Sequence, residues 1–357
     1  MVSRVLVLLM VMAVVVFGLN GQVSGFDVFP ICTGSGIVSP PSISGNIVVW
    51  GDSRNGGWDV YSYDLSTGTE FAITTNQSAH IHPLQPPAID GDIVVWSDIR
   101  NIVLNDNNTD IYGYNLSTNT EFPISTAPVQ QGTHVAVNGD IVAWVQWKGS
   151  DDYDIYGYDL STQVEFPIST AAGYQYEPAT NGEVVVWSDL RVGYDTGGEN
   201  WDIYGYDLST QTEFQITTAD DHQEFADISG NIVVWQDDRN RYGEEGTLHD
   251  IYGYDLDTQT EFSICTNNAR QEQPAISGNF VVWMDDRNGD YDIFGYDLTT
   301  QTEFPIATGL GDQLKPAISG NTVVWESGGD IYGAVIPEPC TLTLLAFGGI
   351  ALVRRKR

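Results

Sequence analysis

Seven copies of one sequence pattern account for most of this chain. Each copy has an apolar stretch that ends in tryptophan, such as Ile232–Trp235 (IVVW), and then a stretch that opens with aspartate, such as Asp250–Leu256 (DIYGYDL). Equivalent residues of neighbouring copies lie 38 to 51 residues apart. A repeat of this length is one supersecondary unit that must stack on its neighbours to bury its apolar surface. The tryptophans are Trp50, Trp96, Trp144, Trp187, Trp235, Trp283 and Trp325, and the aspartates are Asp59, Asp110, Asp154, Asp202, Asp250, Asp292 and Asp330.

Each copy has the pattern of four short β-strands, named A to D here. They are represented by Pro274–Ser277 (PAIS), Ile232–Trp235 (IVVW), Asp202–Leu208 (DIYGYDL) and Glu165–Ser169 (EFPIS). Runs of β-branched and aromatic residues between turn residues are typical of strands. Neither face of strand C is polar, as expected for a strand that is covered on both sides.

Turn residues join the strands within a copy. Gly-Asn or Gly-Asp connects strands A and B in most copies, as at Gly230 and Asn231, and favours a two-residue hairpin because both positions tolerate a positive φ. The turn between strands C and D has Gly68 in the first copy. Gly and Asn suit a left-handed turn position, whereas Gln suits it less well. The later copies have Asn119, Gln163, Gln211, Gln259 and Gln301 there.

Repeats of four strands and this length predict a β-propeller, whose blades stack face to face around an axis. Residues Phe26–Thr33 have the pattern of a strand D without preceding strands, and Pro316–Ile336 have strands A, B and C without a strand D. Together they complete one blade and leave no open edge. We therefore predict an all-β fold: a seven-bladed β-propeller of four-stranded antiparallel blades, closed by an N-terminal strand that completes the last blade. Gly205 in strand C is expected to let the next blade approach closely.

The repeat also resembles that of a known family. The copy QPAISGNFVVWMDDRNGDYDIFGYDLTTQTEFPI, residues 273–306, is similar to the TolB-like propeller repeat, and the similarity extends over residues 26–336. The resemblance implies a fold found in many exported bacterial and archaeal surface proteins. It says little about function, because the superfamily includes scaffolds, partner-binding domains and a few enzymes.

The two ends of the chain differ from the repeats. Residues 1–25 have an early Arg4, an apolar run and then small residues, which is typical of a secretory signal peptide. Residues 337–357 have a Pro-Glu-Pro triplet, a short apolar run and a basic end, an order that resembles the PEP-CTERM sorting signal of exported proteins in Gram-negative bacteria. The residues of this signal are Pro337, Glu338, Pro339, Arg354, Arg355, Lys356 and Arg357.

The PEP-CTERM resemblance implies export to the cell surface or extracellular matrix and processing by an exosortase-type membrane protease. The apolar run, Thr341–Val353, has 13 residues, fewer than the roughly 20 that a transmembrane helix needs. We therefore expect the tail to anchor the chain in the membrane only transiently.

The net negative charge of the chain limits the kinds of partner that it can bind. The chain holds 48 Asp and Glu against 14 Lys and Arg, a net charge of −34, which disfavours binding to nucleic acid or to an anionic membrane surface. Cys32 and Cys265 occupy the same position in different copies, so we expect them to lie far apart and to form no disulfide.

The loops between strands B and C and between strands D and A lie at one end of the predicted ring. The separation of the Trp and the Asp on either side of the B–C loop varies from 5 to 15 residues, and variable loops on a uniform scaffold often bind ligands. All five histidines are expected on this face, where they could form a metal or acid/base cluster or simply occupy polar loops. They are His80, His82, His134, His222 and His249.

An Asp and an Arg two residues apart follow the tryptophan in five copies. A group repeated in five blades is expected to be architectural, so we predict that each Arg pairs with a carboxylate of the same or an adjacent blade, for example the Asp that opens strand C. The third and seventh copies lack this pair and should be held less well. The pairs are Asp52 and Arg54, Asp98 and Arg100, Asp189 and Arg191, Asp237 and Arg239, and Asp285 and Arg287.

One B–C loop offers a possible calcium site. Asp286, Asn288, Asp290 and Asp292 place side-chain oxygens at alternate positions, and Ca²⁺ takes six to eight oxygen ligands. The loop lacks the distal bidentate Glu and the flanking helices of an EF-hand. A polar hairpin without an ion is the alternative.

These features favour an exported, non-catalytic propeller scaffold that binds a glycan or a protein partner through its B–C and D–A loops. No nucleophile elbow, phosphate-binding loop or paired-carboxylate motif occurs in the sequence. Some TolB-like propellers act as polysaccharide lyases with a metal ion and histidines on this face, so a metal-dependent enzyme is the alternative. A purely structural matrix protein is a third possibility. The sequence does not name the ligand.

Overall fold

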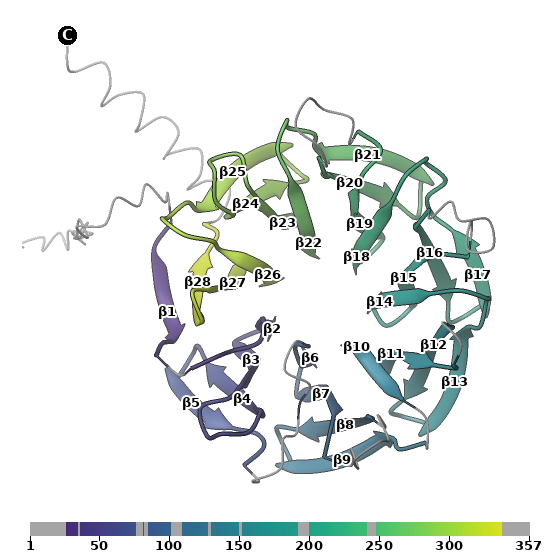
Figure 1. Cartoon of the computed structure of the whole chain (residues 1–357), viewed down its shortest axis with the longest axis vertical. Helices are drawn as coiled ribbons and strands as arrows, with labels where there is room; N and C mark the ends of the chain where they lie inside the picture. Colours follow the sequence, from purple (N-terminus) through teal and green to yellow (C-terminus); the bar gives the residue numbers. More distant parts are fainter. Residues whose placement is uncertain are drawn as a thin grey trace, which may run out of the picture.

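The chain forms a ring of seven four-stranded antiparallel sheets (Figure 1). The predicted seven-bladed β-propeller is confirmed. No helix in the described part of the chain is long and apolar enough to cross a membrane. The proposed signal peptide lies outside the described residues, as does the sorting tail except for Pro337. The computed structural model describes residues 26–34, 36–75, 81, 85–100, 109–127, 130–149, 152–191, 200–240 and 248–337.

In each blade the strands follow the predicted order, with strand A innermost and strand D outermost (Figure 1). Blade 1 has β2 (Ser42–Ser44), β3 (Ile47–Asp52), β4 (Asp59–Asp64) and β5 (Thr69–Ala72). Blade 2 has β6 (Ala88–Asp90), β7 (Ile93–Asp98), β8 (Asp110–Asn115) and β9 (Thr120–Ser125). Blade 3 has β10 (Gln131–Asn138), β11 (Ile141–Trp147), β12 (Tyr153–Asp159) and β13 (Val164–Ser169). Blade 4 has β14 (Gln175–Thr180), β15 (Val184–Asp189), β16 (Asp202–Asp207) and β17 (Thr212–Gln215).

The remaining blades repeat this arrangement. Blade 5 has β18 (Gln223–Ser229), β19 (Ile232–Asp237), β20 (Asp250–Asp255) and β21 (Thr260–Cys265). Blade 6 has β22 (Gln271–Ser277), β23 (Phe280–Asp285), β24 (Asp292–Asp297) and β25 (Thr302–Ala307). Blade 7 has β26 (Leu314–Ser319), β27 (Thr322–Ser327), β28 (Asp330–Val335) and, as its outer strand, β1 (Val28–Cys32).

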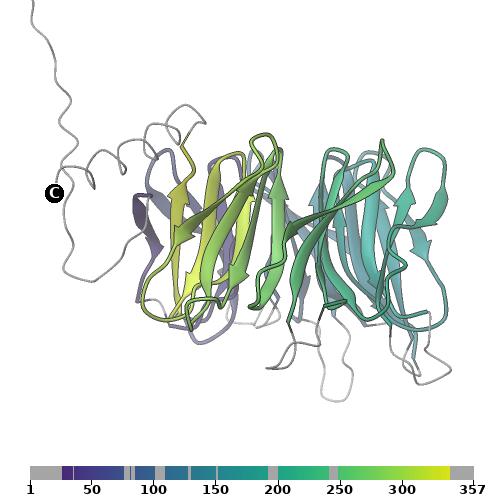
Figure 2. The same ribbon diagram turned by 90° about the horizontal axis from the view of Figure 1, so that it is seen from above.

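The strands run between the two faces of a disc (Figure 2). Because all pairs are antiparallel, the A–B and C–D turns lie on one face, and the B–C and D–A connections lie on the other. We call the second one the loop face. Every blade contributes the same two types of connection to it.

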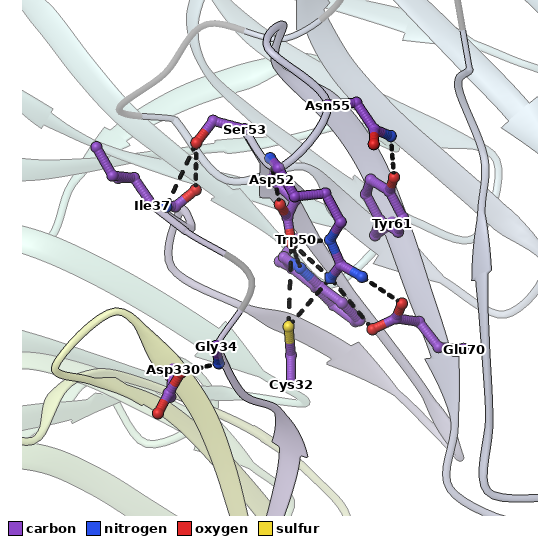
Figure 3. A network of polar contacts seen from close by, with 12 residues as sticks. Cys32, Gly34, Ile37, Trp50, Asp52, Ser53, Asn55, Tyr61, Glu70 and Asp330 are labelled. Atoms are coloured by element: carbon purple, nitrogen blue, oxygen red, sulfur yellow. Dashed lines mark hydrogen bonds and ion pairs between the residues drawn. The ribbon is translucent and has the colours of Figure 1, made fainter.

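The N-terminal strand closes the ring as predicted. Strand β1 pairs with β28, and Phe29 lies opposite Gly333 in the ladder. Beyond the ladder, the backbone N–H of Gly34 donates a hydrogen bond of 2.7 Å to Asp330 (Figure 3). Residues separated by about 300 positions in the chain thus form a single blade.

The core lies between blades rather than at one centre. The seven repeated tryptophans of strand B are between 0 and 2% exposed. Trp96 of blade 2 packs with Val49 and Val60 of blade 1, and the other blades pack in the same way. Burial of a large apolar side chain contributes on the order of 2–3 kcal/mol, so each tryptophan stabilises the contact between two blades.

The glycines of strand C have a different role from the predicted one. A Cβ added at Gly205 would lie 2.6 Å from a ring carbon of Phe214, which belongs to strand D of the same blade. The glycine therefore makes room for the neighbouring phenylalanine and not for the next blade. Blade 1 has Ser62 at this position, and its Phe71 is 38% exposed.

The turn between strands C and D adopts the predicted left-handed conformation even where it holds glutamine. The φ angles at Asn119 and the four glutamines lie between 51° and 58°. The aspartate at the end of strand C stabilises the turn despite the glutamine. In blade 4, Asp207 Oδ1 accepts hydrogen bonds from the N–H groups of Ser209 and Thr210. A hydrogen bond from the Ser209 hydroxyl, together with these N–H groups, lowers the pKa of Asp207.

Closure by β1 predicts a difference between two equivalent phenylalanines. Phe29→Ala should lower the free energy of unfolding by roughly 2 kcal/mol, because it leaves a cavity over Gly333 in the closing blade. Phe71→Ala is the matched control, and it should cost less than about 1 kcal/mol because Phe71 is more exposed. Urea unfolding of both variants measures the difference. Equal losses would contradict a special role of β1 in closure.

Candidate ligand-binding site

The repeated Asp and Arg residues form an ion-pair network within each blade. In blade 1, Arg54 contacts the buried Asp52 at 2.6 Å and Glu70 of strand D at 2.6 Å (Figure 3). Its guanidinium also lies 4.3 Å from the ring centroid of Tyr61 in strand C. Blades 2, 4, 5 and 6 repeat this arrangement. The partners are thus the Asp two residues earlier and a Glu of strand D, rather than the Asp that opens strand C.

Some of these arginines also contact the preceding blade. Arg54 donates to Cys32 Sγ at 3.2 Å (Figure 3). Arg287 donates to Cys265 Sγ at 3.3 Å. Arg191 reaches Ser169 in the same way. Both cysteines are buried and unbridged, as expected from their equivalent positions in different blades. The network therefore links neighbouring blades at their outer strands.

Blade 3 lacks the Asp and Arg, and its contacts differ. Lys148 replaces the Arg and lies 3.4 Å from Asp154, the residue that opens strand C. In the other pairs the indole N–H of the tryptophan donates to the Asp, as Trp50 does to Asp52 at 3.2 Å. With Gln146 in place of the Asp, the buried indole nitrogen of Trp144 has no hydrogen-bond partner. These contacts support the expectation that blade 3 is held less well.

The ion-pair network predicts strongly unequal effects of two arginine substitutions. Arg239→Ala should lower the free energy of unfolding by about 3–5 kcal/mol, because it leaves the fully buried Asp237 without its cation. Arg270→Ala is the control. It removes an ion pair with Asp286 from a side chain that is 48% exposed, and it should cost about 1 kcal/mol or less. Unfolding of both variants in guanidinium chloride measures the two losses of free energy. Similar losses would contradict the prediction.

Hydrogen bonds between consecutive blades bring together two repeat positions on the loop face. A buried glutamine lies at the start of strand A, or directly before it, in blades 3 to 7, and in blades 3, 5, 6 and 7 its N–H donates to a carbonyl of the preceding blade. Gln223 donates to Trp201 at 2.7 Å, and Gln271 donates to His249 at 2.8 Å. Each acceptor is the residue just before the Asp that opens strand C. The side chain of the acceptor therefore lies next to the residue that follows the glutamine in the next blade.

The side chains that meet in this way differ in chemical type from one junction between blades to the next. Tyr153 and Tyr176 meet between blades 3 and 4, with ring centroids 4.9 Å apart. Trp201 and Glu224 line the same pocket between blades 4 and 5. His249 lies 2.9 Å from Glu272 between blades 5 and 6. These positions vary between copies, unlike the residues of the ion-pair network.

Aromatic side chains gather on the loop face at blades 3 and 4. Tyr174 lies 5.4 Å from Tyr153 and 6.4 Å from Trp201, measured between ring centroids. Tyr176 lies 6.1 Å from Trp201 and 6.1 Å from the ring of His134. All of these side chains are only partly buried. We call Tyr153, Tyr174, Tyr176 and Trp201 the aromatic platform.

A pocket of about 350 Å³ adjoins this platform. It is lined by aromatic rings and by two carboxylates, Glu177 and Glu224. Burial and the charge of Glu224 raise the pKa of Glu177 to about 8, although it accepts hydrogen bonds from the Ser188 hydroxyl and the Phe225 N–H. Burial and the charge of Asp238 raise the pKa of Glu224 to about 7, while His249 opposes this shift. The complete lining is Tyr174, Tyr176, Glu177, Ser188, Leu190, Trp201 and Glu224.

Glu177 also faces the central channel. A cavity of about 300 Å³ on the axis is lined by the inner strands of all seven blades, including His134, Glu177 and Lys315. Strand A of blades 4 to 7 is bulged here, with φ between 52° and 56° at Glu177, Phe225, Gln273 and Lys315. Because four blades share this bulge, we attribute it to the architecture. It turns the side chain of Glu177 to a position between the channel and the pocket.

The histidines do not act as one group in the described structure. His134 lies in strand β10, not in a loop, and stacks edge-on against Tyr176. His249 lies between Glu272 and Asp238, which raise its pKa against the opposing effect of burial. The backbone carbonyl of His222 accepts a hydrogen bond from Asp238. His80 and His82 lie outside the described residues, so a cluster that includes them stays a prediction.

In the loop with the predicted calcium site, the carboxylates contact other groups of the same chain. Asp286 pairs with Arg270 at 3.0 Å, and Asp290 accepts a hydrogen bond from the N–H of Gly311. Asn288 donates to Asp292 at 2.6 Å. Within the described ranges no group of three or more His, Cys, Asp or Glu side chains is placed to hold a metal ion. The calcium site stays a prediction without support from these contacts.

Metal removal tests this loop directly. Since its carboxylates already have partners in the protein, excess EDTA should leave the melting temperature of the purified chain unchanged. A scan in added Ca²⁺ serves as the control and should superimpose on the EDTA scan. A melting temperature that falls in EDTA and recovers with Ca²⁺ would instead support the calcium site.

The positions that form this pocket are marked in the sequence by their variation between copies, but the repeat pattern did not predict that they meet. The residues before the strand C aspartate and after the strand A glutamine differ among otherwise similar copies. Their meeting across two blades depends on the register between blades, which no single copy displays. The pairing of Glu177 and Glu224 arises in the same way, although no paired-carboxylate motif is present in the sequence.

Comparison with known proteins supports the fold and leaves the function open. No family model and no curated protein matches the chain. Among solved structures, an oligogalacturonate lyase in complex with manganese is similar with a TM-score of 0.62 and 13% identity, over 89% of this chain and 98% of the lyase. The β-propeller domain of the Trilobed protease from Pyrococcus furiosus has a TM-score of 0.62 and 14% identity, over 86% and 94% of the two chains.

A TolB structure from Acinetobacter baumannii is also similar, with a TM-score of 0.51 and 15% identity, over 80% of this chain and 67% of TolB. At such low identity these similarities concern the fold alone. They agree with the propeller fold and with the resemblance of the repeat. The chain is therefore a seven-bladed β-propeller with a TolB-like fold.

Proposed function

We propose that this chain is an exported, non-catalytic propeller that binds a glycan through the aromatic platform and its adjoining pocket. The observation behind this proposal is the gathering of four aromatic side chains beside a pocket of about 350 Å³ on the loop face. These residues occupy positions that vary between blades, so the scaffold does not require aromatic side chains there.

An aromatic platform suits a sugar for a physical reason. A pyranose ring has faces of C–H groups, which carry a slight positive charge and pack well on the electron-rich face of an aromatic ring. Its hydroxyl groups point outward from the ring edge and need polar partners. Glu177, Glu224 and Ser188 supply such partners at the margin of the platform. The pocket thus combines an apolar surface with a few polar groups, as ligand sites commonly do.

A lyase-like enzyme is the second candidate, since one similar structure is an oligogalacturonate lyase in complex with manganese. Electrostatics disfavours a uronate substrate at this pocket. Oligogalacturonate is a polyanion, whereas the pocket contains Glu177 and Glu224, and neither carboxylate forms an ion pair with Lys or Arg in the described part of the chain. An anionic substrate would find no Lys or Arg among the residues that line this pocket. We therefore favour binding without cleavage.

Export belongs to the proposal and not to the described structure. The support is the signal-peptide pattern of residues 1–25 and the PEP-CTERM resemblance of residues 337–357, which name an exosortase-type protease as a processing partner. Display on the surface of a Gram-negative cell or in its matrix would place the loop face in contact with extracellular glycans. A protein partner on the same face is the alternative to a glycan.

The proposal predicts that glycan binding depends on the aromatic platform. Trp201→Ala should weaken binding at least about tenfold, because a buried aromatic contact at the centre of a site commonly contributes more than about 1.4 kcal/mol. Trp58→Ala is the matched control, since Trp58 holds the same repeat position in blade 1 and is also partly buried. A glycan array of the secreted propeller selects the probe, and calorimetry then compares the variants.

Two outcomes would contradict glycan binding at this site. The first is an array on which the folded propeller retains no glycan. The second is an equal loss of affinity in the Trp58 and Trp201 variants, which would show that the loss comes from a general effect on the fold and not from the platform.

A further inference from the structure

Resting on the proposed glycan-binding function, we propose that the pocket selects glycans with protonated primary amines, the class of 2-amino-2-deoxyhexose polymers without N-acetyl groups. The proposal names the substrate class of the site described above. It follows from the two carboxyl groups of the pocket, the kind of ring that lines it, and the length of the platform.

The pocket holds two carboxyl groups, and no Lys or Arg among the described residues pairs with either of them. Among the described residues, no hydrogen-bond donor and no Lys or Arg contacts the carboxylate of Glu224. Glu177 accepts hydrogen bonds from Ser188 and from the N–H of Phe225, and these donors are neutral. The arginine of blade 4, Arg191, is occupied by Asp189 and Glu213. Among the described residues, His249 is a cationic group whose charge acts on Glu224, and Glu272 and Asp238 already hold it.

Two partly buried carboxylates that face one cavity cost free energy when both are ionised. Burial and the charge of Glu224 raise the pKa of Glu177 to about 8, and burial and the charge of Asp238 raise that of Glu224 to about 7. An ammonium group in the pocket would remove this cost, because it is attracted by both carboxylates and can donate hydrogen bonds to them. A neutral hydroxyl or acetamide group would offset much less of it.

The aromatic lining favours the same ligand. The face of a Trp or Tyr ring attracts a cation, and Trp attracts it most strongly. This chain already uses such contacts internally, since the guanidinium groups of the repeated arginines lie 4.0 to 4.3 Å from the ring centroids of strand C. Trp201, Tyr174 and Tyr176 line the pocket together with the two carboxylates. A cation there would meet rings on one side and carboxylates on the other.

The length of the platform favours a polymer of sugars over a single amine. Rings follow one another from Trp201 through Tyr176 to Tyr153, and His134 also contacts Tyr176. One ammonium group would occupy only the end with Glu177 and Glu224. The remaining rings offer a surface for neighbouring sugar units. A divalent metal ion fits less well, because it requires several oxygen ligands and the lining is largely aromatic.

The experiment compares three hexasaccharides by calorimetry at about pH 6.5, where primary amines are protonated. The probes are the glucosamine hexamer, its fully N-acetylated form and cellohexaose. The glucosamine hexamer should bind the propeller at least about tenfold tighter than either neutral probe. Added salt should reduce this preference, because it screens the charges.

Two isosteric variants test whether the preference for the glucosamine hexamer arises in the pocket. Glu224→Gln removes one charge from the pocket and should abolish most of the preference, while affinity for the neutral probes changes less than about twofold. Glu183→Gln is the matched control. It makes the same change in net charge at an exposed turn on the opposite face, and it should preserve the preference. Thermal unfolding of both variants checks that the fold is retained.

The outcomes separate this inference from the proposed function. Equal affinity for the amine and N-acetyl probes, with both lost in Trp201→Ala, would overturn amine selection and leave glycan binding in place. Absence of binding to all three probes would overturn amine selection, and the glycan array would then decide on glycan binding. Tighter binding of oligolysine than of the glucosamine hexamer, with the same dependence on Trp201 and Glu224, would overturn the glycan class itself.

Discussion

The pairing of β1 with β28 is the constraint on which the rest of the structure depends. A ring of blades leaves no open sheet edge when its first and last members meet, and here residues separated by about 300 positions supply the strands of one sheet. Phe29 fills the space above Gly333, and Gly34 donates to Asp330, so both packing and hydrogen bonding secure the closure. Once the ring is closed, every blade has two neighbours and every strand B tryptophan is buried.

Closure also determines where the residues of the proposed ligand-binding site meet. In blades 3, 5, 6 and 7 the glutamine at the start of strand A donates to the carbonyl just before strand C of the preceding blade, which sets the offset between these blades. Repeated residues such as Asp237 and Arg239 stabilise the blades, and residues that vary between copies lie at the junctions on the loop face. Because the same backbone geometry recurs, a change of side chain alone can give one junction aromatic character and the next one ionisable character.

Much of this arrangement could be predicted from the sequence, and the exceptions share a cause. The strand order, the left-handed turn at Gln211 and the absence of a bridge between Cys32 and Cys265 follow from patterns within one copy or from comparing copies. The role of Gly205, the place of His134 in a strand and the particular carboxylates that pair with Arg54 did not follow from such patterns. Each of these depends on which side chain fills a space in the folded blade.

The sequence by itself determined the number of blades, the strands in each of them and the way in which the ring closes. These properties follow from the period of the repeat and from the incomplete copies at either end of it, since backbone hydrogen bonding and apolar burial act in every copy alike. Only the tertiary structure decided that Trp201, Tyr176, Glu177 and Glu224 share a pocket. Their proximity arises across the junction between two blades, where residues from different copies come together by packing, and no local pattern encodes that contact.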